Sequence, residues 1–295
     1  MPELPDIVAY VEALERHVVG HPLDGIALAS PFLLRSVVPP LAAFDGRHVA
    51  GASRLGKRVV LSFEGDLHLV LHLMIAGRLR WRPPGGKAPG RAALATFRFA
   101  HGWLLLTEAG TTRRASLMAV DGRAALAGLD RGGLEVVGAR FEDFEGRLLL
   151  ENHTLKRSLT DPRLLSGIGN AYSDEILHRA RLSPMLTTAR TTPAQRRALY
   201  DATLAVLEEF TARIRAEVGA GFPETVTAFR PDFAVHGRFG QPCPVCGAPV
   251  QRIRYATNET NYCARCQTGD RLLADRALSR LLKEDFPRTL ADRDG

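Results

Sequence analysis

The sequence is poor in lysine, and its few cysteines are confined to one short segment. Only four of its 39 basic residues are lysine, and the others are arginine. No run of apolar residues approaches the ~18 that a membrane-spanning helix needs, so no such helix is expected. Met1 is followed by Pro-Glu-Leu-Pro-Asp rather than by a basic stretch and an apolar run, which argues against a secretory signal. These absences predict a cytoplasmic protein without a membrane anchor.

The balance of charge is basic. The 295 residues contain 39 Lys and Arg against 32 Asp and Glu, a formal charge of +7. Such an excess favours a polyanionic partner, most simply nucleic acid. With 45% hydrophobic residues, the chain is long enough to bury a sizeable core and is expected to form more than one domain.

All four cysteines lie in two C-x2-C pairs separated by 16 residues: Cys243, Cys246, Cys263 and Cys266. Each pair can place two thiolates on one tetrahedral ion, which predicts one zinc site. Four cysteine ligands leave no position for a substrate, so the zinc would be structural. The alternatives are an iron–sulfur cluster or free thiols.

The segment Val250–Tyr262 between the two pairs is strand-like and basic. It carries Arg252, Arg254 and Tyr255 and can form a hairpin that joins the pairs. A hairpin of this kind is a candidate probe of a nucleic-acid groove. The alternative is an ordinary solvated charged face.

The hydrophobic pattern changes along the chain. Residues 4–19 have helical spacing, and Gly20 is expected to end that helix. Residues 23–125 contain short apolar runs broken by Gly and Pro, which is typical of an antiparallel sandwich or barrel. These runs include Arg58–Phe63, Leu67–Leu73, Ala95–Phe99 and Trp103–Leu106. From about residue 130 the pattern is helical, and Thr192 to Gln195 forms a capping box at the start of a long helix.

The first residues suggest chemistry. Removal of Met1 would leave Pro2 with a secondary amine, which can attack a sugar C1′ and form an iminium. Glu3 stands beside it and could move protons on the sugar and the base. On chemistry alone an ordinary start is the stronger alternative, because Met-Pro beginnings are common and Pro5 simply begins a helix.

A second candidate is the turn Gly167-Ile168-Gly169-Asn170 before a helix. Its backbone N–H groups and the helix dipole favour a phosphate, and Asn170 and Lys156 can add a hydrogen bond and a charge. A tight interhelical turn without a ligand is the alternative for this pattern alone.

Together these segments resemble the formamidopyrimidine-DNA glycosylase/endonuclease VIII family. MPELPD is similar to the N-terminal signature of the family, which implies that Pro2 is the nucleophile and Glu3 is essential. Asp6 replaces the more usual Glu. Asn152–Pro184 is similar to the helix–two-turns–helix, which implies that Lys156 and Asn170 anchor phosphates.

Two further positions follow from the resemblance. Lys57 matches a lysine that the family places near the DNA backbone at the active site. Arg238 aligns with the residues that directly precede the zinc finger in the family. The expected fold is α+β multidomain: an N-terminal antiparallel β-sandwich with flanking helices, a helix–two-turns–helix domain and a C-terminal zinc-finger β-hairpin. The expected bounds are 1–128, 129–235 and 236–285, followed by a flexible tail at 286–295.

The sequence departs from the family where a lesion would be gripped. Arg113 and Arg114 are kept, but Ala115 stands where guanine-specific members have a phenylalanine that helps fill the gap left by the extruded base. The intercalating methionine of the family aligns with Ile75, and Met74 lies one place earlier. Either residue is a candidate wedge, and for Met74 the alternative is an ordinary core residue.

The finger and the segment before it depart as well. Asn258 replaces the usual arginine at the tip of the finger, where Arg254 is the candidate to compensate. Gly219–Val235 lacks the Gly/Thr-rich loop that covers oxidised guanine. We therefore expect oxidised pyrimidines, ring-opened purines or an unusual lesion as substrates, rather than 8-oxoguanine.

The sequence thus predicts a monomeric, zinc-containing DNA glycosylase with AP lyase activity that binds damaged DNA, which we expect to be duplex. It would act through a Schiff base on Pro2 and cut the strand by β- and δ-elimination. The first alternative is a non-catalytic protein that binds damaged DNA on the same scaffold. The second is a zinc-ribbon protein unrelated to repair, which would explain the cysteines but not MPELPD.

Overall fold

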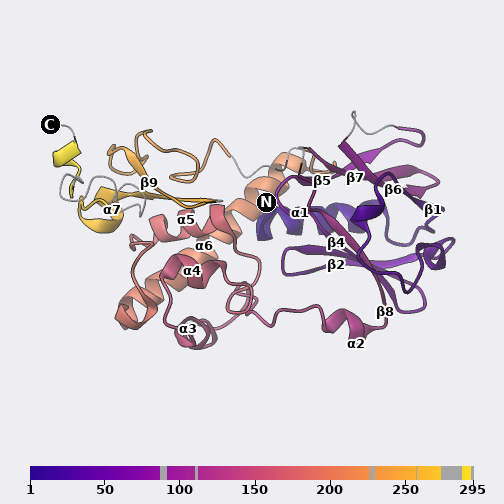
Figure 1. Cartoon of the computed structure of the whole chain (residues 1–295), viewed down its shortest axis with the longest axis horizontal. Helices are drawn as coiled ribbons and strands as arrows, with labels where there is room; N and C mark the ends of the chain where they lie inside the picture. The colour runs from indigo at the N-terminus through magenta and orange to yellow at the C-terminus, as the bar shows by residue number, and fades with distance from the viewer. Residues whose placement is uncertain are drawn as a thin grey trace. The chain divides into compact units, whose positions relative to one another are not determined.

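The computed structural model divides the chain into two compact units (Figure 1). Unit 1 comprises Met1–Arg131 and Phe210–Thr227, and unit 2 comprises Gly132–Glu209 and Ala228–Gly295. The structure describes residues 1–86, 92–109, 112–224, 226, 230–256, 258–273 and 288–293. Residues 286, 287, 294 and 295 of the tail expected at 286–295 lie outside these residues.

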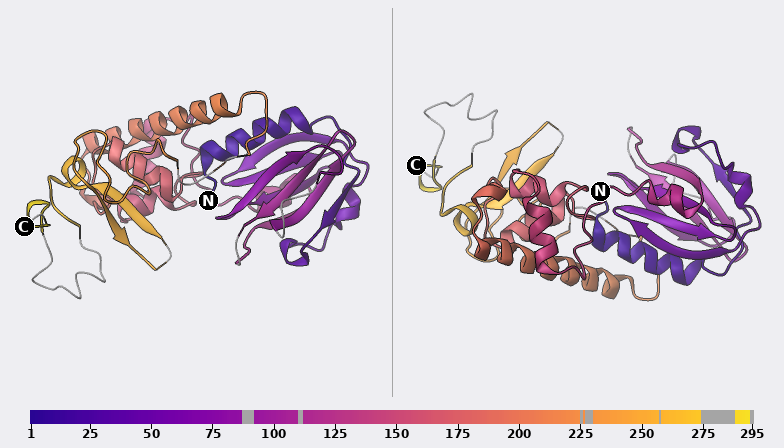
Figure 2. Two further views of the ribbon diagram at one scale, coloured as in Figure 1. Left: turned by 90° about the horizontal axis from the view of Figure 1, so that it is seen from above. Right: turned by 90° about the horizontal axis from the view of Figure 1, so that it is seen from below.

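Unit 1 is built on two four-stranded antiparallel sheets (Figures 1 and 2). One sheet has the order β1-β6-β7-β5 and the other the order β2-β3-β4-β8. The strands are β1 Gly25–Leu28, β2 Val49–Leu55, β3 Arg58–Phe63, β4 Leu67–His72, β5 Gly77–Arg82, β6 Ala93–Phe99, β7 Gly102–Glu108 and β8 Ser116–Asp121. The predicted antiparallel sandwich is confirmed.

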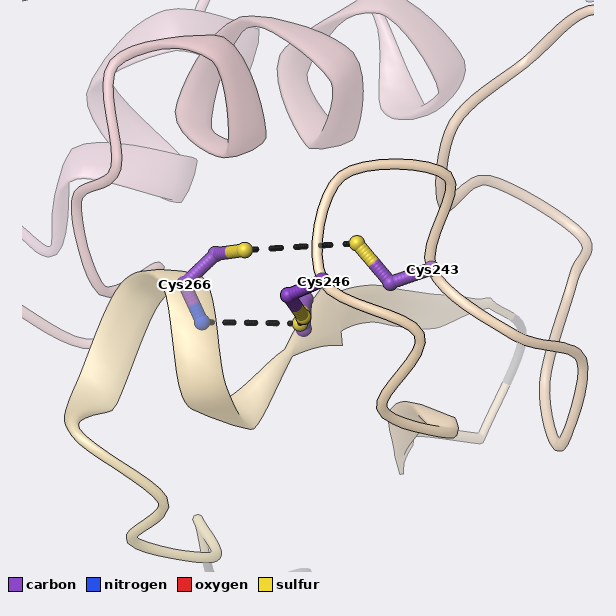
Figure 3. Close-up of side chains that lie close together, drawn as sticks. Cys243, Cys246 and Cys266 are labelled. Atoms are coloured by element: carbon purple, nitrogen blue, oxygen red, sulfur yellow. Dashed lines mark hydrogen bonds between the residues drawn. The ribbon is translucent and has the colours of Figure 1, made fainter.

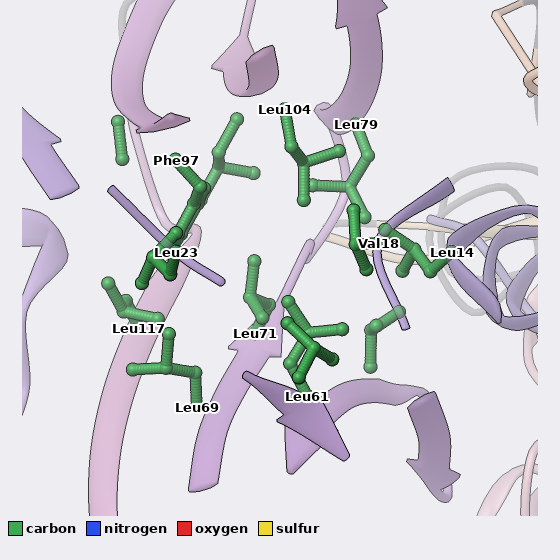
Figure 4. Close-up of a cluster of buried hydrophobic side chains, with 14 of the residues drawn as sticks. Leu14, Val18, Leu23, Leu61, Leu69, Leu71, Leu79, Phe97, Leu104 and Leu117 are labelled. Carbon is green, nitrogen blue, oxygen red and sulfur yellow. The ribbon is translucent and has the colours of Figure 1, made fainter. Parts of the chain in front are cut away.

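The core of unit 1 is formed by apolar side chains from both sheets (Figure 4). In β3 and β4, Leu61 and Leu69 are directly paired, and both are fully buried. From the other sheet Leu79, Phe97 and Leu104 enter the same cluster. Alternate residues of a strand point to opposite faces, so alternate positions of each strand contribute to this core.

Helix α1, Leu4–His17, covers this core with Ile7, Tyr10 and Leu14, all fully buried. The helix ends two residues before the predicted end at residue 19, and Gly20 follows with a positive φ of 81°. The remaining short helices of unit 1 are η1 Pro31–Leu33, η2 Leu41–Phe44 and α2 Arg123–Ala127.

Unit 2 begins with helices, as the change of pattern near residue 130 predicts. They are α3 Phe141–Leu149, α4 Leu155–Thr160, α5 Asn170–Arg179, η4 Thr188–Arg190 and the first part of α6 Pro193–Val218. The predicted capping box of α6 is confirmed, because Thr192 and Gln195 each accept a hydrogen bond from the backbone N–H of the other.

The cysteine segment of unit 2 folds around an antiparallel hairpin of β9 Val250–Arg254 and β10 Glu259–Cys263. Helix α7, Ala264–Thr268, follows directly, and η6 spans Ala291–Arg293. The predicted hairpin between the two cysteine pairs is therefore confirmed.

Helix α6 crosses from unit 2 into unit 1 at Phe210. The sequence-based bounds assign residues 210–227 to the helical domain. The structure groups them with unit 1, because Arg215 binds Glu12 of α1 and Phe222 packs against Tyr10. Among the described residues no helix is both long and apolar enough to cross a membrane.

Replacing Leu61 by alanine should test how far unit 1 depends on this core. Leu61 is fully buried, so the loss of its side chain should lower the free energy of unfolding by about 2–5 kcal/mol. Phe32→Ala is the control, because Phe32 is 79% exposed and its loss should change stability by less than about 0.5 kcal/mol. Urea unfolding followed by tryptophan fluorescence measures both, and equal effects would contradict this core assignment.

Candidate active site and nucleic-acid interface

The N-terminal corner of unit 1 is fixed by the first turn of α1. Pro2 and Glu3 are buried, and Glu3 is the N-cap of the helix. The carboxylate of Asp6 accepts a 2.9 Å hydrogen bond from the Glu3 backbone N–H, and the Glu3 side chain accepts from the backbone of Asp6 in return. This reciprocal capping fixes the residue that directly follows Pro2, the candidate nucleophile.

Burial and nearby charges act on the amine at the start of the chain. Burial lowers the pKa of the Met1 amine from its ordinary value of 8.0, and the charges of Arg78 and Lys57 lower this pKa further. Glu3 and Asp6 act in the opposite direction. An amine in this corner therefore loses its proton more readily than an exposed one, which is what a nucleophile needs.

Lys57, from the β2–β3 turn, belongs to the same corner. Burial lowers the pKa of its ammonium, while the charge of Glu3 raises it. The structure thus brings together Pro2, Glu3 and Lys57, which the sequence singled out separately. It adds Asp6 and Arg78, which sequence reasoning did not name as site residues.

Asp6 should make the stability of unit 1 depend on pH. Burial raises its pKa from 3.8 to about 7, so between these values the folded protein holds a proton that the unfolded chain has released. Stability from this group is therefore lost as the pH rises through that window. Asp6→Asn removes the ionisation. The unfolding free energy of this variant minus that of the parent protein should therefore increase from pH 4 to 8. Urea unfolding at several pH values measures this, and a constant difference would contradict it.

The candidate wedge residues lie on the β4–β5 turn. Met74 has a positive φ of 52° and is half-buried, and its backbone N–H donates to Nδ1 of His72 at 3.1 Å. Ile75 is 59% exposed, and its carbonyl accepts a hydrogen bond from Arg78. Of the two candidates, Ile75 is therefore the more exposed.

Arg113 and Arg114 are both exposed at the start of β8. The carboxylate of Glu108 holds their segment by accepting hydrogen bonds from the backbone N–H groups of Arg114 and Ala115, at 2.9 and 3.0 Å. Ala115 itself is buried in the core of unit 1. The cost of burying Glu108 is offset by these hydrogen bonds, which fix the segment that presents the arginines.

The segment after α6 is held against β5. Glu224 pairs with Arg80 and Arg82 and accepts a hydrogen bond from the backbone N–H of Trp81. Two residues on, the carbonyl of Val226 accepts from Nε of Arg78 at 2.6 Å. Alternate arginines on one face of β5 thus fasten this segment next to the N-terminal corner.

In unit 2, Lys156 lies beside the start of α5. Its Nζ donates to the Asp174 carboxylate at 2.6 Å and to the carbonyl of Asn170 at 2.7 Å. The lysine side chain is only 12% exposed. Two of the three ammonium donors therefore serve to hold α4 against α5, and the expected phosphate contact of Lys156 stays a prediction.

Two buried carboxylates of α5 organise this region. Asp174 also accepts from Nδ1 of His236 at 2.7 Å and from the backbone N–H of Asn261. Glu175 accepts from the backbone N–H groups of residues 234 to 236. The sequence pattern did not predict these roles, although the run Ser173-Asp174-Glu175 on a buried helix was a signal that could have been used.

Breaking the Lys156–Asp174 pair should destabilise unit 2. Lys156→Met leaves a fully buried carboxylate without its cation, which typically costs about 3–5 kcal/mol. Adding Asp174→Asn should recover part of that loss. The control is Arg197→Met, because the Arg197–Asp201 pair is more than half exposed and should contribute less than about 1 kcal/mol. Unfolding free energies of the parent protein, Lys156→Met, the double variant and Arg197→Met test this, and a double variant that is no more stable than Lys156→Met would contradict it.

The remaining predicted DNA contacts lie near the hairpin. The side-chain amide of Asn170 donates to the carbonyl of Glu259 at 2.9 Å, which joins the start of α5 to β10. Arg254 and Asn258 are exposed at the end of the hairpin, where the Asn258 carbonyl accepts from the backbone N–H of Tyr255. Arg238 is half-buried and donates to the carbonyl of Phe233.

The four cysteines converge on one point, and Figure 3 shows three of them, Cys243, Cys246 and Cys266. All four sulfur atoms lie within 4.8 Å of one another, with Cys243 and Cys266 at 4.0 Å and Cys246 and Cys263 at 3.4 Å. Zn–S bonds of about 2.3 Å in a tetrahedron place the sulfurs about 3.8 Å apart. The residues therefore fit one structural zinc, as the sequence predicts.

Three family models match successive parts of the chain. The model of the formamidopyrimidine-DNA glycosylase N-terminal domain matches residues 1–124, that of the H2TH domain matches 137–217, and that of the zinc finger found in FPG and IleRS matches 240–269. The chain belongs to the formamidopyrimidine-DNA glycosylase/endonuclease VIII family. The predicted resemblance is confirmed, and members of the family are DNA glycosylases.

Known relatives match over most of the chain. Formamidopyrimidine-DNA glycosylase of Heliobacterium modesticaldum is 33% identical over 280 residues, covering 90% of this chain and all of the relative. An uncharacterized formamidopyrimidine-DNA glycosylase-like protein of Mycobacterium tuberculosis is 40% identical over 151 residues, which cover 51% of this chain and 94% of the relative. The Heliobacterium relative thus extends the family assignment beyond separate domains.

Solved structures share the fold. Lactococcus lactis Fpg in complex with DNA containing an abasic site has a TM-score of 0.79 at 23% identity, covering 90% of this chain and 99% of its own. MutM in complex with DNA containing carbocyclic 8-oxo-G has a TM-score of 0.80 at 22% identity, covering 90% and 100%. At this identity the likeness supports the architecture alone.

Proposed function

We propose that the chain is a bifunctional DNA glycosylase and AP lyase of base excision repair, with the amine of Pro2 as its nucleophile. The observation that carries the proposal is the buried N-terminal corner, in which Glu3, Asp6, Lys57 and Arg78 surround the start of the chain. The family assignment supports a glycosylase. Removal of Met1 is required, because only then is the Pro2 nitrogen a free amine.

The proposed reaction proceeds through a covalent intermediate on Pro2. The Pro2 nitrogen bonds to C1′ of the damaged nucleotide as the bond from C1′ to the base breaks, and the base leaves with a proton. Glu3 moves protons on the sugar as its ring opens and an iminium forms. The iminium makes the C2′ proton acidic, so its removal expels the 3′ phosphate by β-elimination. A second elimination expels the 5′ phosphate, and water then releases the enzyme.

The DNA contacts are proposed on both units. The exposed Ile75 of unit 1 is the wedge, and the exposed Arg113 and Arg114 lie on the segment fixed by Glu108. In unit 2 the start of α5, with Lys156 and Asn170, and the exposed Arg254 and Asn258 of the finger would contact phosphates, and Arg238 would contribute charge. These contacts predict that binding weakens steeply as salt is added.

The proposed lesions are oxidised pyrimidines and ring-opened purines rather than 8-oxoguanine. The described part of the segment after α6 supports this preference. Glu224 holds it against Arg80 and Arg82, and Phe222 packs on Trp81, so it is engaged with unit 1. A segment held in this way is less free to fold over 8-oxoguanine.

Borohydride trapping tests the nucleophile. The Met1-processed protein should form a covalent adduct with a duplex containing an abasic site, and peptide mapping should place the adduct on Pro2. Pro2→Gly should lower the yield by about tenfold or more, and Glu3→Gln should stop base release. Lys57→Ala is the matched control, since Lys57 is the other amine in this corner with a lowered pKa. An adduct on Lys57 would contradict the assignment.

The same experiment decides between the enzyme and a non-catalytic binder of damaged DNA. Duplexes with thymine glycol, formamidopyrimidine or 8-oxoguanine would be compared with the abasic site. The lesion that also gives an adduct identifies the substrate. Tight binding to all of them without any adduct would favour the non-catalytic protein. That alternative is supported by Asn258, which replaces the arginine at the tip of the finger, and by Ala115, which replaces the phenylalanine of guanine-specific members.

A further inference from the structure

The first cysteine pair contacts helix α5 through a histidine. Nε2 of His178, near the end of α5, lies 3.3 Å from Sγ of Cys243. Both residues are buried, with exposures of 6% and 2%. Buried polar atoms need hydrogen-bond partners within the protein, because water does not reach them. The Nε2 and Sγ atoms are close enough to be such partners for each other.

The direction of this hydrogen bond follows from the chemistry of a zinc site. A zinc ligand sulfur is a thiolate, which has no proton and only accepts. The hydrogen between the two atoms must therefore belong to Nε2 of His178. Residues that donate a hydrogen bond to a metal ligand commonly orient that ligand and stabilise its charge. The ring of His178 is placed to do both for the Cys243 sulfur.

The second cysteine pair is fastened nearby by a different side chain. Gln267 of α7 accepts from the backbone N–H of Cys263 at 2.8 Å and donates to the carbonyl of Leu182 at 2.9 Å, just after α5. Each pair of cysteines is thus joined to α5 or to the residues that follow it. His178 is the member of this arrangement that reaches a sulfur atom.

We propose that His178 is a positioning residue of the zinc site, which donates its Nε2–H to the Cys243 sulfur and thereby slows the loss of zinc. The same bond joins the zinc module to the helix that carries Asn170 and Asp174. The proposal concerns metal retention and does not depend on glycosylase activity, so it can fail or succeed independently of the proposed function.

The first test uses the unmodified full-length protein. Zinc is replaced by 113Cd and the histidines are labelled with 15N. The proposal predicts that NMR finds His178 protonated on Nε2, with a scalar coupling between its Nε2 proton and the 113Cd through the hydrogen bond. A ring protonated only on Nδ1, or an Nε2 proton without coupling to cadmium, would overturn the proposal.

The second test measures zinc transfer from the full-length protein to a chromogenic chelator. His178→Phe keeps a ring but loses the donor, and should release zinc about tenfold faster or more. His178→Gln can place an amide N–H near the position of Nε2, so it should stay within about threefold of the parent. His48→Phe, in unit 1 and half-exposed, is the control for histidine replacement.

Cobalt spectra show whether the effect acts at the sulfur. In cobalt-substituted protein the thiolate-to-metal charge-transfer band of His178→Phe should shift relative to the parent, and that of His178→Gln should not. Equal release rates and unshifted bands for all variants would contradict the proposal. If His178→Phe fails to fold, the NMR measurement on the unmodified protein decides alone.

Discussion

The reciprocal hydrogen bonds of Glu3 and Asp6 at the start of α1 are the constraint on which the proposed chemistry depends. They make the helix begin at a defined residue, so Pro2, which directly precedes this N-cap, has a fixed place in unit 1. Removing two carboxylates from water is unfavourable. This desolvation is offset because each carboxylate accepts a hydrogen bond from the backbone N–H of the other residue. The positive charges of Arg78 and Lys57 complete the corner, and they favour the neutral form of an amine there.

Unit 2 uses the same device in another place. Asp174 and Glu175 of α5 are buried and accept hydrogen bonds from Lys156, from His236 and from the backbone of residues 234 to 236. These contacts join α4, α5 and the hairpin into one unit. In both units, buried acids hold the segments on which the proposed ligand contacts lie.

The sequence predicted what depends on short-range pattern. Short apolar runs predicted the strands that contain Leu61 and Leu69. Thr192 and Gln195 predicted the start of α6, and the spacing of the cysteines predicted the zinc site. Long-range pairings were beyond it. Three contacts illustrate this: Glu224 pairs with Arg82, Glu108 accepts a hydrogen bond from the backbone of Ala115, and His178 contacts Cys243. Each joins residues that are distant in sequence or far from any motif. Such contacts depend on tertiary packing, which periodicity does not encode.

The most direct test of the account is the pKa of the Pro2 amine itself. The Met1-processed protein, labelled with 15N at proline, would be titrated by NMR beside the free peptide Pro-Glu-Leu-Pro-Asp. The account predicts a lower pKa for the Pro2 amine in the folded protein than in the peptide, because burial and the charges of Arg78 and Lys57 disfavour its protonated form. An equal or higher pKa in the protein would contradict the claim that this fold prepares the amine as a nucleophile.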